Sequence, residues 1–302
     1  MRRRDFIKGI VVSAAWPPVA WAQQPAMPII GFLHSGSAAE NAERLEAFRK
    51  GLKQAGFVEG SNVAIEFRWA DGRYDRLPGM AADLIARQVA VIATPLSTPA
   101  SLVAKAATTT IPIVFTVGGD PVALGLVASL SRPGGNLTGV TSMNSDLAAK
   151  RLGLLRSLVP QAAHFFALVH PDDPLAQPFT SDLQAAAAAV GVEIKFLHAT
   201  TPSELDAAFA GIPQQPGNAM LVSTNSFFYV RREQIAALAT RFGVPASFDD
   251  ANYVRAGGLI GMGPIPPTNA SRPPFMSAAY SKAKSRPICR SCKNRNSRSR
   301  SI

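Results

Sequence analysis

The sequence predicts an α/β protein with two lobes, each built on a mainly parallel β-sheet. First, short apolar segments alternate with longer amphipathic ones along residues 28–263, and this alternation occurs twice over similar lengths. Second, most of the short segments are apolar throughout, which is typical of strands covered by helices on both faces of a sheet. Third, the chain has 302 residues, enough for two lobes of about 100–150 residues each. Two such lobes imply a hinge that joins them and a cleft between them.

The first half of the alternation, residues 28–141, contains five expected strands and three expected helices. The strands are expected at 29–33, 63–67, 89–93, 113–117 and 137–140. The helices are expected at 40–55, 77–88 and 100–107. In the first of these helices, charged residues separate the apolar side chains of Leu45, Phe48 and Leu52. Gly56 then ends this helix.

The second half, residues 142–263, repeats the alternation. Its helices are expected at 147–158, 179–190, 204–209 and 231–242. Its strands are expected at 165–169, 193–197, 219–222, 246–248 and 259–262. Because each half has the pattern of a parallel α/β sheet, we expect one lobe from each half, with the boundary after residue 141.

Small polar side chains follow several of the expected strands, and parallel sheets bind ligands outside the carboxyl ends of their strands. These candidates are Ser35, Ser37, Ser97, Thr98, Asp120, Asn225 and Asp249. Ser97 and Thr98 precede Pro99 at an expected helix start, where free N–H groups suit a ligand carboxylate. Capping and turn chemistry is the simpler explanation of any one of these residues. Their joint placement after successive strands favours a ligand-binding site.

Catalytic motifs are absent from the sequence, which has no G-x-S-x-G elbow, no H-E-x-x-H motif and no Walker loop. The four histidines are scattered singly, which favours structural roles over metal ligation. Asp172 and Asp173 lie in a proline-flanked segment typical of a turn. Phe227 and Tyr229 are candidates for stacking on a ligand or equally for the core, whereas Phe228 is expected in the core. We therefore expect no catalytic residue, no metal and no cofactor.

Residues 1–22 have the order of a bacterial signal peptide, with basic residues, an apolar stretch at 9–19 and then Ala20 and Ala22. The segment "RRDFIK" resembles the twin-arginine export signal, which is read by a receptor. A membrane anchor is the alternative, but the apolar stretch is shorter than the ~20 residues that a spanning helix needs. We expect cleavage near Ala22 and export to the periplasm.

The formal net charge of +11 is concentrated at the two ends of the chain. Residues 1–22 carry +3, residues 265–302 carry +9, and the part between them carries −1. The body of the protein therefore does not indicate a nucleic-acid partner. The only two cysteines, Cys289 and Cys292, also lie in the basic C-terminal part, so no disulfide is expected in the body.

Five segments together resemble one bacterial family. They are "IGFL" at 30–33, "FRKGLKQAGFVEG" at 48–60, "VAKAATTTIPIVF" at 103–115, "GGDPVALGLVASLSRPGGNLTGV" at 118–140 and "RREQIAALATRFGVP" at 231–245. The family is the ABC-transporter substrate-binding proteins related to the tryptophan- and tyrosine-type binding proteins, and the resemblance covers residues 28–263. It implies a non-enzymatic, type I periplasmic-binding fold that closes by hinge motion around a small molecule, such as an aromatic amino acid. It further implies a permease partner in the inner membrane, and we expect a monomer.

The ligand loops of this family match the candidate residues above by position, and the resemblance adds Phe227 and Tyr253 as aromatic contacts. Where the family often has Gly-Gly-Thr, this chain has Leu96, Ser97 and Thr98. A periplasmic ligand-sensing domain of a signalling system is the alternative function, because such domains share the fold. The signal peptide and the lack of a signalling domain in the sequence favour transport.

The segment 264–302 departs from the family and is a Ser-, Arg- and Lys-rich tract without periodicity. One interpretation is a disordered basic tail. A frameshift near 263–271 fits better, because permitted codons for 278–293, read one nucleotide out of frame, give "GRILKGEKPADLPVVQ". That peptide is similar to the normal C-terminal segment of the family. Resequencing the DNA of this stretch distinguishes the two interpretations.

Overall fold

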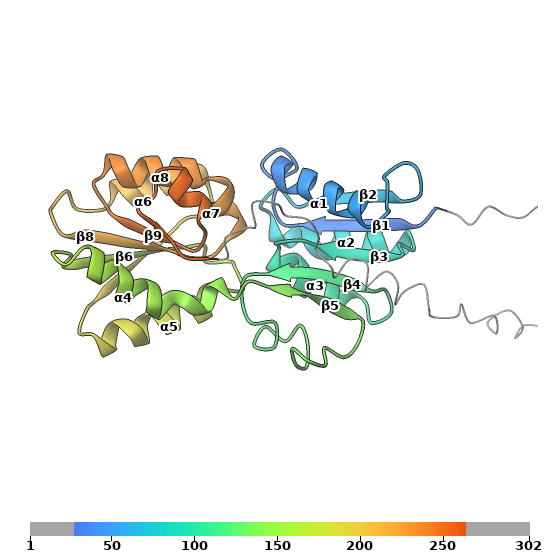
Figure 1. The fold of residues 1–302 in the computed structure, drawn as a ribbon, viewed down its shortest axis with the longest axis horizontal. Helices are drawn as coiled ribbons and strands as arrows, with labels where there is room; N and C mark the ends of the chain where they lie inside the picture. Colours follow the sequence, from blue (N-terminus) through green and yellow to red (C-terminus); the bar gives the residue numbers. More distant parts are fainter. Residues whose placement is uncertain (1–26, 264–302) are drawn as a thin grey trace, which may run out of the picture.

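The computed structural model describes residues 27–263, which form two α/β lobes (Figure 1). The predicted signal peptide at 1–22 and the basic tail at 264–302, with Cys289 and Cys292, lie outside the described residues. None of the helices in residues 27–263 is long and apolar enough to span a membrane.

The first lobe is a five-stranded parallel sheet covered by helices on both faces. Its strands are β1 (Ile29–His34), β2 (Ala64–Trp69), β3 (Val91–Thr94), β4 (Ile113–Val117) and β5 (Leu137–Thr141), in the order β2-β1-β3-β4-β5. Its helices are α1 (Ala42–Gln54), α2 (Leu77–Ala86) and α3 (Thr98–Ala107), with a 3₁₀ helix at Tyr74–Arg76. Ile30 of β1 packs in the same cluster as Leu52 of α1, whereas Leu33 packs with Leu84 of α2. Both faces are therefore buried, which explains why these strands are apolar throughout.

The second lobe repeats this architecture. Its strands are β6 (His164–Val169), β7 (Ile194–His198), β8 (Asn218–Val222), β9 (Ala246–Phe248) and β10 (Ile260–Gly261), in the order β7-β6-β8-β9-β10. Its helices are α4 (Ala148–Leu158), α5 (Ala176–Ala189), α6 (Pro202–Ala210), α7 (Ser226–Val230), α8 (Arg232–Arg241) and α9 (Asn252–Arg255). Helices α4 and α5 cover one face of the sheet, and α6 and α8 cover the other (Figure 1). When the strands of each lobe are counted along the sequence, both sheets have the order second, first, third, fourth, fifth.

Every strand and helix predicted within residues 28–263 is present, with ends that differ by up to three residues. The sequence does not predict α7 and α9, because helices of five and four residues are too short to show a hydrophobic period. Phe228 of α7 is completely buried in the core of the second lobe, as predicted.

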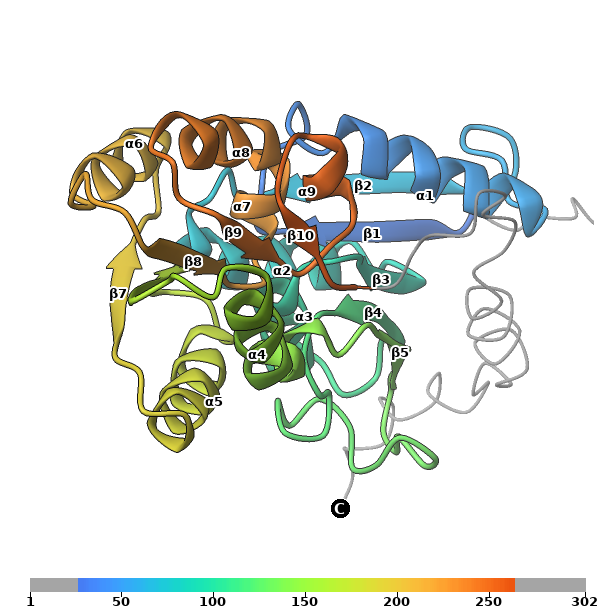
Figure 2. The same cartoon turned by 60° about the vertical axis from the view of Figure 1, so that its left-hand side comes forward.

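Within the described residues the chain passes from the first lobe to the second between β5 and α4, through a 3₁₀ helix at Asn144–Leu147. Helix α1 of the first lobe and α8 of the second lie on the same side of the molecule in both views (Figures 1 and 2). The loops that follow the strands of the two sheets face each other across the boundary between the lobes. This boundary therefore contains the predicted binding edges of both sheets.

Candidate functional site

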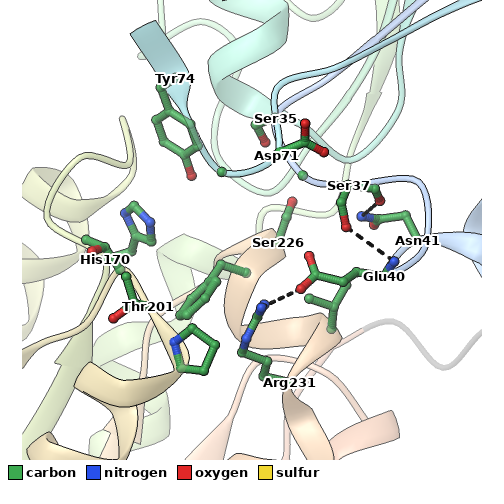
Figure 3. A pocket seen from close by; sticks show the side chains of 16 residues that line it. Ser35, Ser37, Glu40, Asn41, Asp71, Tyr74, His170, Thr201, Ser226 and Arg231 are labelled. Carbon is green, nitrogen blue, oxygen red and sulfur yellow. Dashed lines mark hydrogen bonds and ion pairs between the residues drawn. The ribbon is translucent and has the colours of Figure 1, made fainter. Parts of the chain in front are cut away.

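Two cavities lie at the boundary between the lobes. Cavity A, of about 240 Å³, is lined by residues that include Ser35, Ser37, Glu40, Asp71, Tyr74, His170, Thr200, Thr201, Ser226, Phe227 and Arg231 (Figure 3). Cavity B, of about 470 Å³, is lined by residues that include Glu43, Arg44, Leu96, Thr98, Gly118, Asp173, Asn225, Ser226, Tyr229, Asp249 and Asp250. Because Ser226 lines both cavities, the start of α7 forms part of the wall between them.

Hydrogen bonds between the lobes run along this wall. The Ser226 hydroxyl donates to the backbone carbonyl oxygen of Leu96 at 2.6 Å. The side-chain amide of Asn225 lies 3.5 Å from the Tyr74 hydroxyl oxygen. Leu96 has a φ of +53°, in the left-handed region that favours glycine. The first lobe therefore contacts Ser226 through a backbone conformation that is strained for leucine.

Charged side chains join the lobes beside the cavities. Arg231, which follows α7, forms an ion pair with Glu40, which precedes α1. The guanidinium carbon of Arg44 lies 3.9 Å from the centre of the Tyr229 ring, a cation–π contact between α1 and α7. These contacts hold the two lobes together on the side of α1.

Cavity B has charged groups of both signs. Arg44 comes from the first lobe, and its Nε atom is buried without a hydrogen-bond partner among the described residues. Asp173 and Asp249 come from the second lobe. Burial raises the pKa of Asp173 to about 6 and also raises the pKa of Asp249. Cavity B can therefore bind an anionic group and a cationic group of the same small molecule.

Asn225 ties α7 to the turn that follows β6. Its side-chain oxygen accepts a hydrogen bond from the N–H of Phe227 at 2.7 Å and so caps α7. Its side-chain nitrogen donates to the carboxylate of Asp173 at 2.6 Å. Asp173 in turn accepts a hydrogen bond from the N–H of Leu175 at 2.8 Å. One amide side chain thus positions both a wall of the cavities and a carboxylate of cavity B.

Arg151 of α4 supports the same region from inside the second lobe. Its side chain is completely buried. Its Nη2 atom donates to the carbonyl oxygens of Val222 at 2.7 Å and Ser247 at 2.5 Å. These carbonyls lie near the carboxyl ends of β8 and β9, just before the segments that contain Asn225 and Asp249. Arg151 therefore fixes two neighbouring strand ends at the edge of cavity B.

A family model described as "ABC transporter substrate binding protein" matches residues 33–266. The chain belongs to this family. It is also similar to a curated relative, the tyrosine-binding protein of Clostridioides difficile (strain R20291), with 26% identity over 214 residues. This match covers 71% of the chain, and the chain spans only 61% of the length of the relative.

Solved structures have the same fold as this ABC transporter substrate-binding protein. A domain of Streptococcus pneumoniae in complex with L-Trp has a TM-score of 0.65 and 21% identity, over 77% of each chain. The leucine-binding protein LivK of Thermotoga maritima has a TM-score of 0.56 and 14% identity, over 84% of this chain and 76% of LivK. These similarities confirm the predicted bilobed α/β fold of the type I periplasmic-binding class. The family consists of substrate-binding proteins, not enzymes.

Most of the candidate residues from the sequence lie at one of the two cavities. Ser35, Ser37 and Phe227 line cavity A. Thr98, Asn225 and Asp249 line cavity B. Ser35 and Asp249 are 214 residues apart in a chain of 302, so only the meeting of the two lobes brings these residues to the same boundary.

Three other candidates do not line either cavity. Ser97 is completely buried, and its hydroxyl donates to the Ser35 hydroxyl at 2.9 Å. Asp120 accepts a hydrogen bond from the N–H of Val122 at 2.8 Å, which is the turn chemistry considered as its alternative role. Tyr253 is completely buried, and its ring stacks on Phe248 with centroids 4.4 Å apart.

Several lining residues are not among the candidates from the sequence. They are Arg44, Tyr74, His170, Asp173 and Arg231. His170 directly follows β6, so its place at a strand end was a signal that could have found it. Asp173 does lie in the predicted turn, and it also lines cavity B. Within residues 27–263, no group of three or more His, Cys, Asp or Glu side chains is placed to hold a metal ion.

Proposed function

We propose that this family member is the exported solute-binding component of an ABC import system and that its solute binds in cavity B. The position of cavity B carries the proposal, because the cavity lies between the lobes and takes side chains from both. Arg44 and Thr98 come from the first lobe, and Asn225 and Asp249 come from the second. Hinge closure around a solute then completes the site, and opening releases the solute to an inner-membrane permease.

An aromatic amino acid fits the chemistry of cavity B. Arg44 and the N–H groups at the start of α3, near Thr98, suit its carboxylate, and Asp173 and Asp249 suit its ammonium group. The ring of Tyr229 offers a surface for its side chain. A volume of about 470 Å³ lies within the range of small-molecule sites, roughly 300–1,000 Å³. The names of the relatives support this ligand class, since one binds tyrosine and the other is in complex with L-Trp.

Calorimetric titration of the full chain with each of the common L-amino acids tests the proposal. We expect an aromatic amino acid to bind, and we expect Asp249→Asn to weaken its binding tenfold or more, because a charge-assisted hydrogen bond is lost. Asp120→Asn is the matched control, since it makes the same chemical change outside both cavities. Absence of amino-acid binding, or equal effects of the two variants, contradicts this ligand and site, and turnover of a bound compound contradicts the function.

Export to the periplasm as a monomer completes the proposed function. Replacing Arg3 and Arg4 by Lys keeps the charge of the leader but removes the arginine pair that the twin-arginine receptor reads. Cell fractionation should then find the chain in the cytoplasm, whereas the unaltered chain is found in the periplasm. Equal export of the two chains contradicts this route. Light scattering of the exported protein measures its oligomeric state.

A further inference from the structure

Cavity A has no role in the proposed function, and the start of α7, with Ser226, lies between it and cavity B. It is formed by loops after β1 and β2 in the first lobe and after β6 and β7 in the second, with α7 toward cavity B. The side chains of Ser35, Ser37, Tyr74, His170 and Ser226 surround a common space in Figure 3. Both lobes therefore contribute hydrogen-bonding groups to this second cavity.

The charged side chains that line cavity A are compensated by partners. Glu40 and Arg231 form an ion pair with each other. Asp71 pairs with Arg76 at 3.2 Å. Burial lowers the pKa of His170 below its ordinary value, so its ring is neutral at pH 7. Cavity A thus offers no uncompensated charge, in contrast to cavity B, where Asp173 and Asp249 outnumber Arg44.

Hydroxyl groups make up most of the polar lining of cavity A. They belong to Ser35, Ser37, Tyr74, Thr200, Thr201 and Ser226. Two nitrogen atoms at this cavity, His170 Nδ1 and Arg231 Nη1, are buried without a hydrogen-bond partner in the part of the chain that the structure describes. His170 as a whole is only 4% exposed. An unpaired buried polar group costs about 1–3 kcal/mol, so both atoms favour a bound molecule with hydrogen-bonding oxygens.

Aromatic rings form the rest of the lining of cavity A. The Tyr74 and His170 rings are stacked with centroids 5.4 Å apart. The Phe227 ring meets His170 edge-on at 5.8 Å. Ring faces pack against C–H groups, while neutral hydroxyls and imidazole exchange hydrogen bonds with O–H groups. We propose that cavity A is a second binding site, which takes a small uncharged molecule rich in hydroxyl groups, such as a monosaccharide or a polyol.

A charged ligand is disfavoured in cavity A, because the charged side chains that line it already have partners. A carboxylate or ammonium group enclosed there loses its hydration, and the ion pair of Glu40 with Arg231 leaves no free counter-charge to replace it. Charge is therefore the property that should separate the ligands of the two cavities. Neutral hydroxylated molecules should select cavity A, and zwitterions should select cavity B.

The test is calorimetric titration of the full chain at millimolar concentrations with D-ribose, D-xylose, D-glucose, glycerol and myo-inositol. Glucosamine and gluconate serve as charged analogues of one of these probes. We expect at least one neutral probe to bind and both charged analogues to bind at least tenfold more weakly. His170→Phe keeps an aromatic ring but removes both nitrogens, and it should weaken the binding of the neutral probe about tenfold. His164→Phe, at the exposed start of β6, is the matched control and should leave this binding intact.

Variants of the other cavity separate this proposal from the proposed function. Asp249→Asn should leave the neutral probe bound as tightly as before, whereas it weakens amino-acid binding. If His170→Phe does not fold, Ser37→Ala takes its place with the same expected direction. Failure of all neutral probes to bind overturns the second site, and so does a neutral probe that Asp249→Asn weakens as much as His170→Phe. Either result leaves the amino-acid titration as an independent test of cavity B.

Discussion

Leu96 is strained at the wall between the two cavities, and this strain has a measurable consequence. Its φ of +53° lies in the left-handed region, where a residue with a Cβ costs about 1–2 kcal/mol more than glycine. Its carbonyl oxygen accepts the hydrogen bond from Ser226, so the conformation of Leu96 is tied to the contact between the lobes. The family that the sequence resembles often has glycine at this position, and glycine is the residue that suits such a backbone.

Replacing Leu96 by Gly and by Ala separates the strain from the side chain. Both variants lose the same leucine side chain, which is 41% exposed, but only the alanine variant keeps a Cβ in the left-handed conformation. Glycine loses about 0.5–1 kcal/mol through its larger freedom in the unfolded chain, which offsets part of the relief of about 1–2 kcal/mol. We therefore expect Leu96→Gly to be more stable than Leu96→Ala by about 0.5–1 kcal/mol.

Equilibrium urea unfolding of the full chain, followed by circular dichroism, measures this difference as a shift of the midpoint at constant slope. Gly153 in α4 provides the control, because it is helical and a Cβ there meets no atom within 4 Å. Gly153→Ala should stabilise the protein by about 0.5–1 kcal/mol, so alanine is favoured at 153 and glycine at 96. A Leu96→Ala variant as stable as Leu96→Gly would refute the strain argument.

Three further predictions concern the charged groups of the site. Asp173 has a pKa of about 6 in the folded protein, above the unfolded value of about 4, so stability should fall as pH rises from about 4 to about 6, by at most about 3 kcal/mol. In Asp173→Asn the free energy of unfolding, measured with urea at several pH values, should change less with pH across this window. The same pH dependence as in the wild type would exclude the raised pKa. Arg151→Met leaves two buried carbonyls without their donor and should lower the unfolding free energy by about 2–4 kcal/mol; a change near zero would show that they find other partners. Glu40→Gln removes the ion pair with Arg231, worth about 0.2–1 kcal/mol, and so weakens the contact between the lobes. Small-angle X-ray scattering should then show a larger radius of gyration for the variant. High salt should increase the radius of gyration of the wild type and leave that of the variant unchanged.

The sequence predicts the elements of this protein well, and it also predicts most of the strand-end side chains that lie where the lobes meet, because both depend on local patterns. Apolar runs and helical periods place every strand and the longer helices, and polar residues after strands point to Ser35, Thr98 and Asp249. The same rule also selects Asp120, which makes a turn instead. A strand-end position shows where a side chain begins, but the side chain's own hydrogen bonds decide whether it faces the cavity.

By itself, the sequence determined the two parallel α/β lobes and the edges at which they meet, since hydrophobic period and strand order act within each lobe. Only the tertiary structure decided which side chains share a cavity. Arg44 on α1 and Tyr229 on α7 contact each other across the boundary, although no local pattern relates them. The division of the boundary into a charged cavity and a hydroxyl-lined one likewise depends on α7 meeting Leu96. Such contacts join residues that are distant in the chain, so they arise only when the two lobes are packed face to face.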